Sequence, residues 1–391
     1  MDSTAEVIIV GAGMAGLALA MQLGRQGRPV LILEKAAAPR DKVCGEGLMP
    51  LGVAALARVG LEPGELPGQN FLGLLYRSGR QETLLNFGAA AQGRGIRRTV
   101  LLEALQTAAL GYSTVRLLQD EAIAPLREGG TIRGVRGRGG EYRGQVVVAA
   151  DGVQSRFAHA AGLPMRPYGY RMGLRRHYRV PGGETWDRVR IGLFAPHDVY
   201  LTPVGEDTVL ATTMTTHAGY DAVKENYGDF LRASPFGGIF RGAEPVSEQM
   251  GWHHPLYAHR GHQGQSMLLV GDAGGSLDPC LGMGISLALL TAQYAHEAVT
   301  AMLERPEERA QALNKYEAAC QQLYRHYRIF DYIFRFMVLS KARGELLMWG
   351  MRHWPETADA ILGAVAECNP WRGIPWRSLL FPGRRDMVGK G

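Results

Sequence analysis

Glycines at fixed spacing near the start of the chain are the first residues whose pattern indicates chemistry. Gly11, Gly13 and Gly16 lie between an apolar, strand-like run and a helical pattern. In a β-α-β unit the first glycine permits a tight turn, the second lets the backbone approach a pyrophosphate, and the third lets helix pack on strand. The helix N-terminus adds N–H groups that favour an anion. The motif predicts a dinucleotide site formed by Gly11, Gly13, Met14, Ala15 and Gly16.

An acidic residue follows at the end of the next predicted strand. Glu34 ends the apolar run 29–33, about twenty residues after the motif, which is the usual offset of an acid that binds a ribose 2′-OH. Its negative charge would repel a 2′-phosphate, so NADP is disfavoured in this position.

A second glycine-rich segment lies far downstream. Gly271-Asp272 follows an apolar run over 266–270, where a carboxylate can accept a hydrogen bond from a ribityl hydroxyl. The helix after it would direct N–H groups at the electron-rich edge of a flavin. A glycine-rich turn without a ligand is the alternative for this segment alone. Together with the first motif it predicts FAD, with contacts from Asp272, Gly282, Met283, Gly284 and Ile285.

The elements that must position these residues follow a mixed α/β pattern. Apolar runs predict buried strands, a helix over 51–59 ends at Gly60, and another helix follows Arg97-Arg98. A β-rich stretch interrupts this pattern, and the chain after Ile285 is mostly helical. We therefore expect a discontinuous FAD-binding domain (1–72, 97–165 and 262–305), a substrate-binding β domain (73–96 and 166–261) and a helical C-terminal region (306–391).

Composition restricts the class of protein. With 391 residues, 46% of them hydrophobic and 20% charged, the chain is expected to be globular. The net charge of +6 is spread along the chain, so no nucleic-acid partner is predicted. Four scattered cysteines predict no metal site and a reducing, cytoplasmic setting. We expect no export signal and no membrane-spanning helix.

Three motifs in order resemble a known superfamily. Gly11-x-Gly13-x-x-Gly16, Asp151-Gly152-Val-Gln-Ser155 and Gly271-Asp272 are similar to the glutathione-reductase-type FAD fold of the p-hydroxybenzoate hydroxylase-type (group A) FAD-dependent monooxygenases, the geranylgeranyl reductases and the flavin halogenases. The resemblance implies a Rossmann-like FAD-binding domain, whose parallel sheet has crossover strands. It also implies an inserted, mostly antiparallel substrate sheet and a helical C-terminal region.

The resemblance also suggests site residues. It places Arg98, or its neighbour Arg97, near the pyrophosphate or ribityl part of FAD, and backbone around Ala122 at the adenine. Lys35 is included among the expected FAD contacts. The family form of the Asp-Gly motif continues to an arginine at the position where this chain has Ala158, which weakens a nicotinamide role for that motif.

Candidate catalytic groups come from a loop and from the inserted sheet. Cys44 and Gly45 fall where the family's chain passes between FAD and substrate, and Cys44 is either an active-site thiol or a small buried filler. His177 and Tyr200 could contact substrate or transfer a proton, the alternative being strand residues that only pack.

The C-terminal segment 324–338 mixes aromatic and basic residues at helical spacing. One interpretation is an interfacial helix that contacts a membrane surface or a lipophilic substrate. The favoured alternative is a helix packed on the FAD-binding domain.

The implied function is that of an FAD-dependent monooxygenase of secondary metabolism. It would use NAD(P)H and dioxygen to hydroxylate an aromatic or polyketide-like small molecule through a flavin C4a-hydroperoxide. The first alternative is a prenyl or polyene double-bond reductase of the geranylgeranyl type, favoured by Cys44-Gly45 but lacking tryptophan in Tyr200-Leu-Thr-Pro203. Halogenation is less favoured, because Trp371 to Trp376 lies far from the position of the halogenase signature. A non-enzymatic flavin-binding redox partner is the remaining alternative.

Overall fold

A mixed sheet forms the centre of the first domain. The computed structural model describes residues 4–37, 40–88, 91–163, 165–181, 186–260 and 267–367. The strand order is β8-β2-β1-β11-β10-β9, with β18 also paired to β11. The strands β8, β2, β1, β11 and β18 run parallel, whereas β9 and β10 form an antiparallel crossover. Their bounds are β1 Thr4–Val10, β2 Val30–Glu34, β8 Val115–Gln119, β9 Ala122–Glu128, β10 Thr131–Gly137, β11 Glu141–Ala149 and β18 Met267–Leu269.

Apolar residues cover both faces of this sheet. On β1, Val7 and Ile9 face one core together with the helices α1, α3 and α7, while Ile8 and Val10 face a second core that contains Phe157. Burial on both faces explains why β1 is a continuous apolar run instead of an alternating one. The helices are α1 Met14–Arg25, α3 Arg98–Leu110, α4 Arg156–Ala160 and α7 Gly284–Glu304.

A second sheet forms the inserted domain. Its order is β16-β12-β15-β14-β13-β5-β6, with β17 on the same edge of β12 as β16, and its pairs are antiparallel except β13 with β5. These strands are β5 Gly73–Ser78, β6 Gln81–Asn86, β12 Pro167–Arg179, β13 Val189–Phe194, β14 His197–Pro203, β15 Thr208–Thr215, β16 Glu244–Pro245 and β17 Met250–Tyr257. The predicted fold class is confirmed.

The two faces of this second sheet differ in chemistry. One face packs against α5 His217–Val223 and α6 Tyr227–Ala233 through apolar residues such as Leu174, Val199 and Val209. Because side chains alternate along a strand, the other face carries Arg171 and Arg175 of β12 together with Asp198 and Tyr200 of β14. The polar face contacts the first domain through ion pairs.

A small three-stranded sheet joins the two domains. It has the order β3-β7-β4, with β3 Gly47–Leu48, β4 Gln69–Phe71 and β7 Gly93–Gly95. Next to it, α2 Pro50–Val59 ends at Gly60, whose φ of 100° is left-handed. The predicted stop signal is confirmed.

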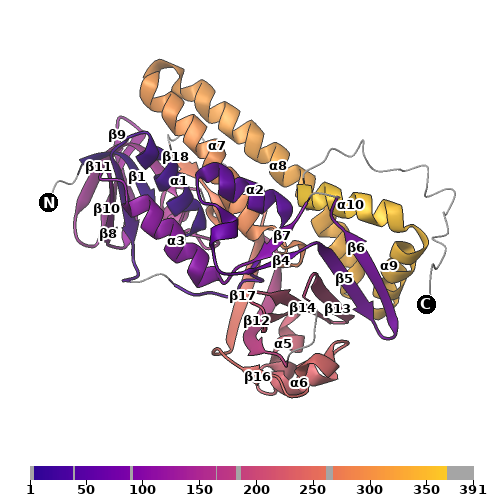
Figure 1. Ribbon diagram of the computed structural model, residues 1–391. Coiled ribbons are helices and arrows are strands. Elements are labelled where there is room, and N and C mark those ends of the chain that lie inside the picture. Colours follow the sequence, from indigo (N-terminus) through magenta and orange to yellow (C-terminus); the bar gives the residue numbers. More distant parts are fainter. Residues whose placement is uncertain are drawn as a thin grey trace.

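Helices complete the described chain. α8 Arg309–Val338 packs along α7, and α9 Lys341–His353 and α10 Pro355–Glu367 lie beside β5 and β6 (Figure 1). The predicted packing of segment 324–338 on the FAD-binding domain is confirmed, since Tyr324 donates to the Gly275 carbonyl at 3.0 Å. Among the described residues no helix has the length and apolarity needed to cross a bilayer.

Candidate active site

The predicted dinucleotide loop has the backbone that its glycines require. Gly11 has φ 106°, and a Cβ there would lie 2.5 Å from the Ala150 carbonyl oxygen. A Cβ on Gly16 would lie 2.1 Å from the Gly11 carbonyl oxygen, so α1 packs too closely on β1 for any side chain. At Gly13, by contrast, the nearest protein atom to an added Cβ is 3.9 Å away. Gly13 therefore faces open space at the α1 N-terminus.

Glu34 lies at the end of β2 beside this loop. Its carboxylate accepts hydrogen bonds from Ala12 N at 2.9 Å and from Ala36 N at 3.0 Å. The side chain is half-buried, whereas Lys35 is exposed. Ala122 begins β9 and is half-buried. Glu34, Lys35 and Ala122 lie outside the lining of the cavity described next.

A cavity of about 560 Å³ extends from the dinucleotide loop to the C-terminal helices. Several lining glycines face it with open backbone: an added Cβ on Gly45, Gly152 or Gly284 would meet no protein atom within 4 Å. A flat ligand could therefore approach the backbone at these positions. The predicted site residues that line the cavity are Gly13, Met14, Ala15, Cys44, Gly45, Arg98, Tyr200, Asp272, Gly282, Met283, Gly284 and Ile285.

The cavity also has groups for the polar parts of a cofactor. Arg98 lines it and is 6% exposed, and within the described part of the chain its buried Nε has no hydrogen-bond partner. Arg97, the alternative arginine, is not among the lining residues. Asp272 is held by Lys42, with 3.3 Å between Nζ and Oδ2. The open glycines, a guanidinium with an unpartnered nitrogen and a carboxylate fit the pyrophosphate, ring and ribityl groups of FAD.

The end of the cavity at which the sequence predicts the flavin has a tight turn before α7. The Asp278 carboxylate accepts from Cys280 N at 3.1 Å, and Gly282 has φ 67°. α7 then starts at Gly284 with no acidic residue in its first turn. An electron-rich ring edge would meet the positive end of this helix.

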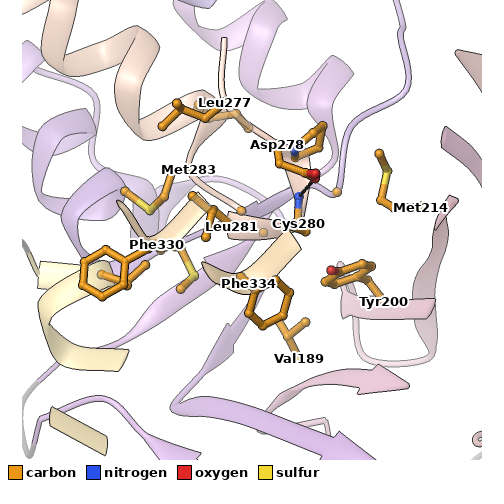
Figure 2. A pocket seen from close by; sticks show the side chains of 18 of the residues that line it. Val189, Tyr200, Met214, Leu277, Asp278, Cys280, Leu281, Met283, Phe330 and Phe334 are labelled. Carbon is orange, nitrogen blue, oxygen red and sulfur yellow. Dashed lines mark hydrogen bonds between the residues drawn. The ribbon is translucent and has the colours of Figure 1, made fainter. Parts of the chain in front are cut away.

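The far end of the cavity is apolar. Figure 2 shows Phe330 and Phe334 of α8 on one side of it and Tyr200 and Met214 of the inserted sheet on the other. Further lining residues from the sheet and from α8 to α10 are Leu74, Tyr76, Val189, Ile191, Met337, Leu347, Met351, Ala358 and Leu362. This end suits an apolar ligand.

The three candidate catalytic residues have different surroundings. Cys44 is half-buried in the lining, where its sulfur accepts from Glu46 N at 3.4 Å. Tyr200 lines the cavity, but its hydroxyl is buried and makes no hydrogen bond to the described residues. Burial and the nearby Asp198 raise the pKa of Tyr200 well above its ordinary value, so the phenol is protonated. His177 is fully buried and absent from the lining.

Two buried ionic groups were not predicted, and each includes one residue of the cavity lining, Asp278 in the first and Glu46 in the second. Arg171 donates to Asp198 at 2.6 Å and lies 3.6 Å from Asp278, with all three side chains at most 2% exposed. Glu46 accepts from His177 Nε2 at 2.7 Å. Arg171 and Arg175 lie on the same face of one strand. Because an unpaired buried charge is costly, this spacing could have indicated buried acidic partners.

Comparisons with known proteins agree with this architecture. Residues 9–40 match the model of the NAD(P)-binding Rossmann-like domain. Squalene epoxidase 2, mitochondrial, of Arabidopsis thaliana is 35% identical over 42% of this chain, and the match spans only 30% of that epoxidase's length. Digeranylgeranylglycerophospholipid reductase 1 of Methanopyrus kandleri is 27% identical over 82% of this chain and 87% of its own length.

A solved structure has the same fold. The probable FAD-dependent monooxygenase pqsL from Pseudomonas aeruginosa superposes with a TM-score of 0.76 at 21% identity, over 88% of this chain and 99% of that chain. The fold, the order of the motifs and the relatives all agree with the resemblance that the sequence indicated. In its fold and motif order the chain is therefore similar to the superfamily with the glutathione-reductase-type FAD fold, which includes the p-hydroxybenzoate hydroxylase-type monooxygenases, the flavin halogenases and the geranylgeranyl reductases, and the comparisons show an FAD-dependent oxidoreductase.

Proposed function

We propose that this protein is an FAD-dependent monooxygenase that uses NAD(P)H and dioxygen to oxygenate an apolar small molecule, aromatic or polyketide-like in character. The observation that carries the proposal is the continuity of one cavity from the Gly13 and Asp272 region to the apolar end around Phe334. The apolar lining at that end would bind such a molecule beside the proposed flavin position, and exclusion of water favours oxygen transfer at a flavin. The names of the Arabidopsis epoxidase and of the Pseudomonas monooxygenase support oxygenation.

When bound, FAD supplies the redox chemistry, and the residues of the chain bind, orient and shield. We propose that Gly11, Gly16 and Glu34 shape the adenosine half of the site, that Arg98 binds the pyrophosphate, and that Asp272 binds ribityl. Gly45 and Gly284, which have no side chain, would leave room for the flavin ring. Tyr200 and Cys44 are the polar groups of the lining that we propose to face the substrate.

A double-bond reductase is the second candidate. It is favoured by Cys44 in the cavity wall and by the match to the archaeal lipid reductase over most of both chains. The experiment that separates the two is reduction of the FAD-loaded protein with NADPH and a panel of aromatic and polyprenyl compounds, with and without dioxygen. Oxygenated product supports the first proposal, and an anaerobic product with one double bond fewer supports the second.

We further propose that the protein contacts a membrane surface with the side of α8 and α9 that bears exposed apolar residues. Ile333 and Leu346 line the cavity and are also 55% and 57% exposed, so the cavity wall reaches the surface there. Around them are exposed Ile329, Tyr332, Phe336 and Trp349, with Arg325, Arg328, Lys341 and Arg352 also on the surface. Rings and aliphatic groups beside cations suit an anionic bilayer, from which an apolar substrate could enter.

A further inference from the structure

Glu46 has an uncommon backbone in the loop that lines the cavity. It lies between Gly45 and Gly47, and it is the one non-glycine residue with positive φ, 55°, among the described residues. Such a conformation is uncommon outside glycine and asparagine, and it persists only where surrounding contacts hold it. The Glu46 side chain is 2% exposed, and its carbonyl oxygen accepts from Ile96 N at 3.0 Å.

The Glu46 carboxylate joins three separate segments. Its Oε1 accepts from the backbone N–H of Arg98 at 3.0 Å, and its Oε2 accepts from His177 Nε2 at 2.7 Å. Arg98 is the first residue of α3, a helix with no side-chain cap of its own. The carboxylate therefore caps α3 from 52 residues away, where a negative charge also interacts favourably with the helix dipole.

The neighbours of His177 fix the position of its proton. Arg175 Nη1 lies 3.3 Å from His177 Nδ1, and a guanidinium can only donate. We therefore assign Nδ1 as the acceptor and Nε2 as the protonated nitrogen that donates to Glu46. The Ser247 hydroxyl also lies 3.0 Å from Nδ1, and its oxygen accepts from the His177 backbone N–H at 2.9 Å. Both ring nitrogens are thus occupied within the protein.

Arg175 compensates the buried charge. Arg175 Nη1 lies 3.9 Å from Glu46 Oε1, and its Nη2 is paired with Asp41 at 2.5 Å. Asp41 and Glu46 bracket the cavity-lining residues Lys42 to Gly45, so β12 holds this loop at both ends. The loop contains Cys44, which faces the cavity.

We propose that Glu46 is a positioning residue of the cofactor site and that His177 holds it in place. Through this contact the inserted sheet fixes the start of α3, and with it the Arg98 guanidinium, at the position for the FAD pyrophosphate. The inference rests on the proposed role of Arg98 at the cofactor. It assigns to His177 a function at the cofactor site in place of contact with substrate, and it predicts that FAD affinity depends on a histidine that does not line the cavity.

The test is a double-mutant cycle read out as FAD affinity. FAD is removed, and the dissociation constant is measured by flavin fluorescence for wild type, Glu46→Ala, Arg98→Ala and the double variant. Loss of the helix cap should weaken FAD binding by about 10- to 100-fold in the wild-type background. If Glu46 acts through Arg98, the same substitution should have less than a threefold effect in the Arg98→Ala background.

Milder variants cover the risk that Glu46→Ala does not fold. Glu46→Gln keeps an oxygen for the Arg98 N–H but cannot keep the His177 contact without a change of tautomer, so its loss of affinity should be intermediate. His177→Ala should weaken FAD binding in the same direction. Tyr227→Phe is the matched control: this buried hydroxyl bonds Thr213 at 3.0 Å on the opposite face of the same sheet. It should lower Tm and leave FAD affinity unchanged.

Equal losses in the two backgrounds would overturn the proposal, as would an Arg98→Ala protein that binds FAD normally. Loss of FAD affinity in Tyr227→Phe would also overturn it, because any damage to the sheet would then act on the cofactor. The readout is independent of turnover. A protein that binds FAD as expected but forms no oxygenated product would contradict the proposed function and leave this inference standing.

Discussion

Arg171 and Asp198 form an ion pair in the interior of the protein, with Nη2 2.6 Å from Oδ2 and both side chains at most 2% exposed. The Nε of the same guanidinium lies 3.6 Å from Oδ2 of Asp278, a residue of the cavity wall. One cation thus faces two buried carboxylates. It connects two strands of the inserted sheet to the turn that precedes α7.

This arrangement predicts a pH dependence of stability. Burial, together with the charge of Asp278, raises the pKa of Asp198 from 3.8 to about 7 in spite of Arg171. Between pH 4 and pH 7 the folded state therefore binds more protons than the unfolded state, and this group's contribution is lost as the pH rises. Asp198→Asn should become more stable relative to wild type from pH 5 to pH 8, by about 1 to 4 kcal/mol. Urea unfolding at several pH values measures this difference, and parallel curves for the two proteins would contradict it.

Substitutions at two glycines of the dinucleotide loop should have different effects on stability and on cofactor binding. Gly13→Ala places a methyl group in open space, so the free energy of unfolding of the apoprotein should change by less than about 0.5 kcal/mol. The methyl group would occupy the pyrophosphate position and lower FAD affinity by about tenfold or more. Gly11→Ala, by contrast, meets the Ala150 carbonyl and should destabilise the apoprotein by about 1 to 3 kcal/mol. Equal Tm losses for the two variants would count against this distinction.

Asp272 should contribute to FAD binding rather than to the stability of the fold. Its ion pair with Lys42 is partly exposed, with side chains 26% and 42% accessible, so it contributes only about 0 to 1 kcal/mol to stability. Asp272→Ala should therefore lower FAD occupancy after purification with little change in apoprotein Tm. Lys42→Met serves as the control for the ion pair. Unchanged FAD content in Asp272→Ala would remove the ribityl assignment.

The exposed apolar residues of α8 and α9 should bind anionic bilayers. Sedimentation with phosphatidylcholine vesicles should capture the protein only when phosphatidylglycerol is included, and added salt should release it. Ile333→Glu combined with Phe336→Glu should abolish capture. Ile123→Glu is the matched control, because Ile123 is 50% exposed on β9 in the other domain. Capture of the double variant at the wild-type level would exclude this surface as the contact.

Local patterns predicted structural features whose partners lie close in the chain. The Gly11 to Gly16 loop, Glu34 and the stop at Gly60 could be identified because their partners lie within a few residues or at a fixed offset. Asp272 and the glycines before α7 followed for the same reason. The fold class followed from the order of apolar runs and the β-rich interruption.

Contacts between distant segments could not be predicted in this way. His177 was a candidate for substrate contact or proton transfer, with packing within a strand as the alternative, and its partner in the structure is Glu46, 131 residues earlier. β17, Met250–Tyr257, lies within the predicted β domain but was not predicted as an individual strand, and it is held by pairing along β12. Such pairings depend on tertiary packing that no local pattern encodes.

The fate of dioxygen distinguishes a monooxygenase from a double-bond reductase. FAD-loaded protein is reduced with NADPH and exposed to isotopically labelled dioxygen in the presence of the panel of aromatic and polyprenyl compounds, and products are analysed by mass spectrometry. We expect one labelled oxygen atom in the product and no product under anaerobic conditions. A product formed without dioxygen, with two added hydrogens and no label, would contradict it.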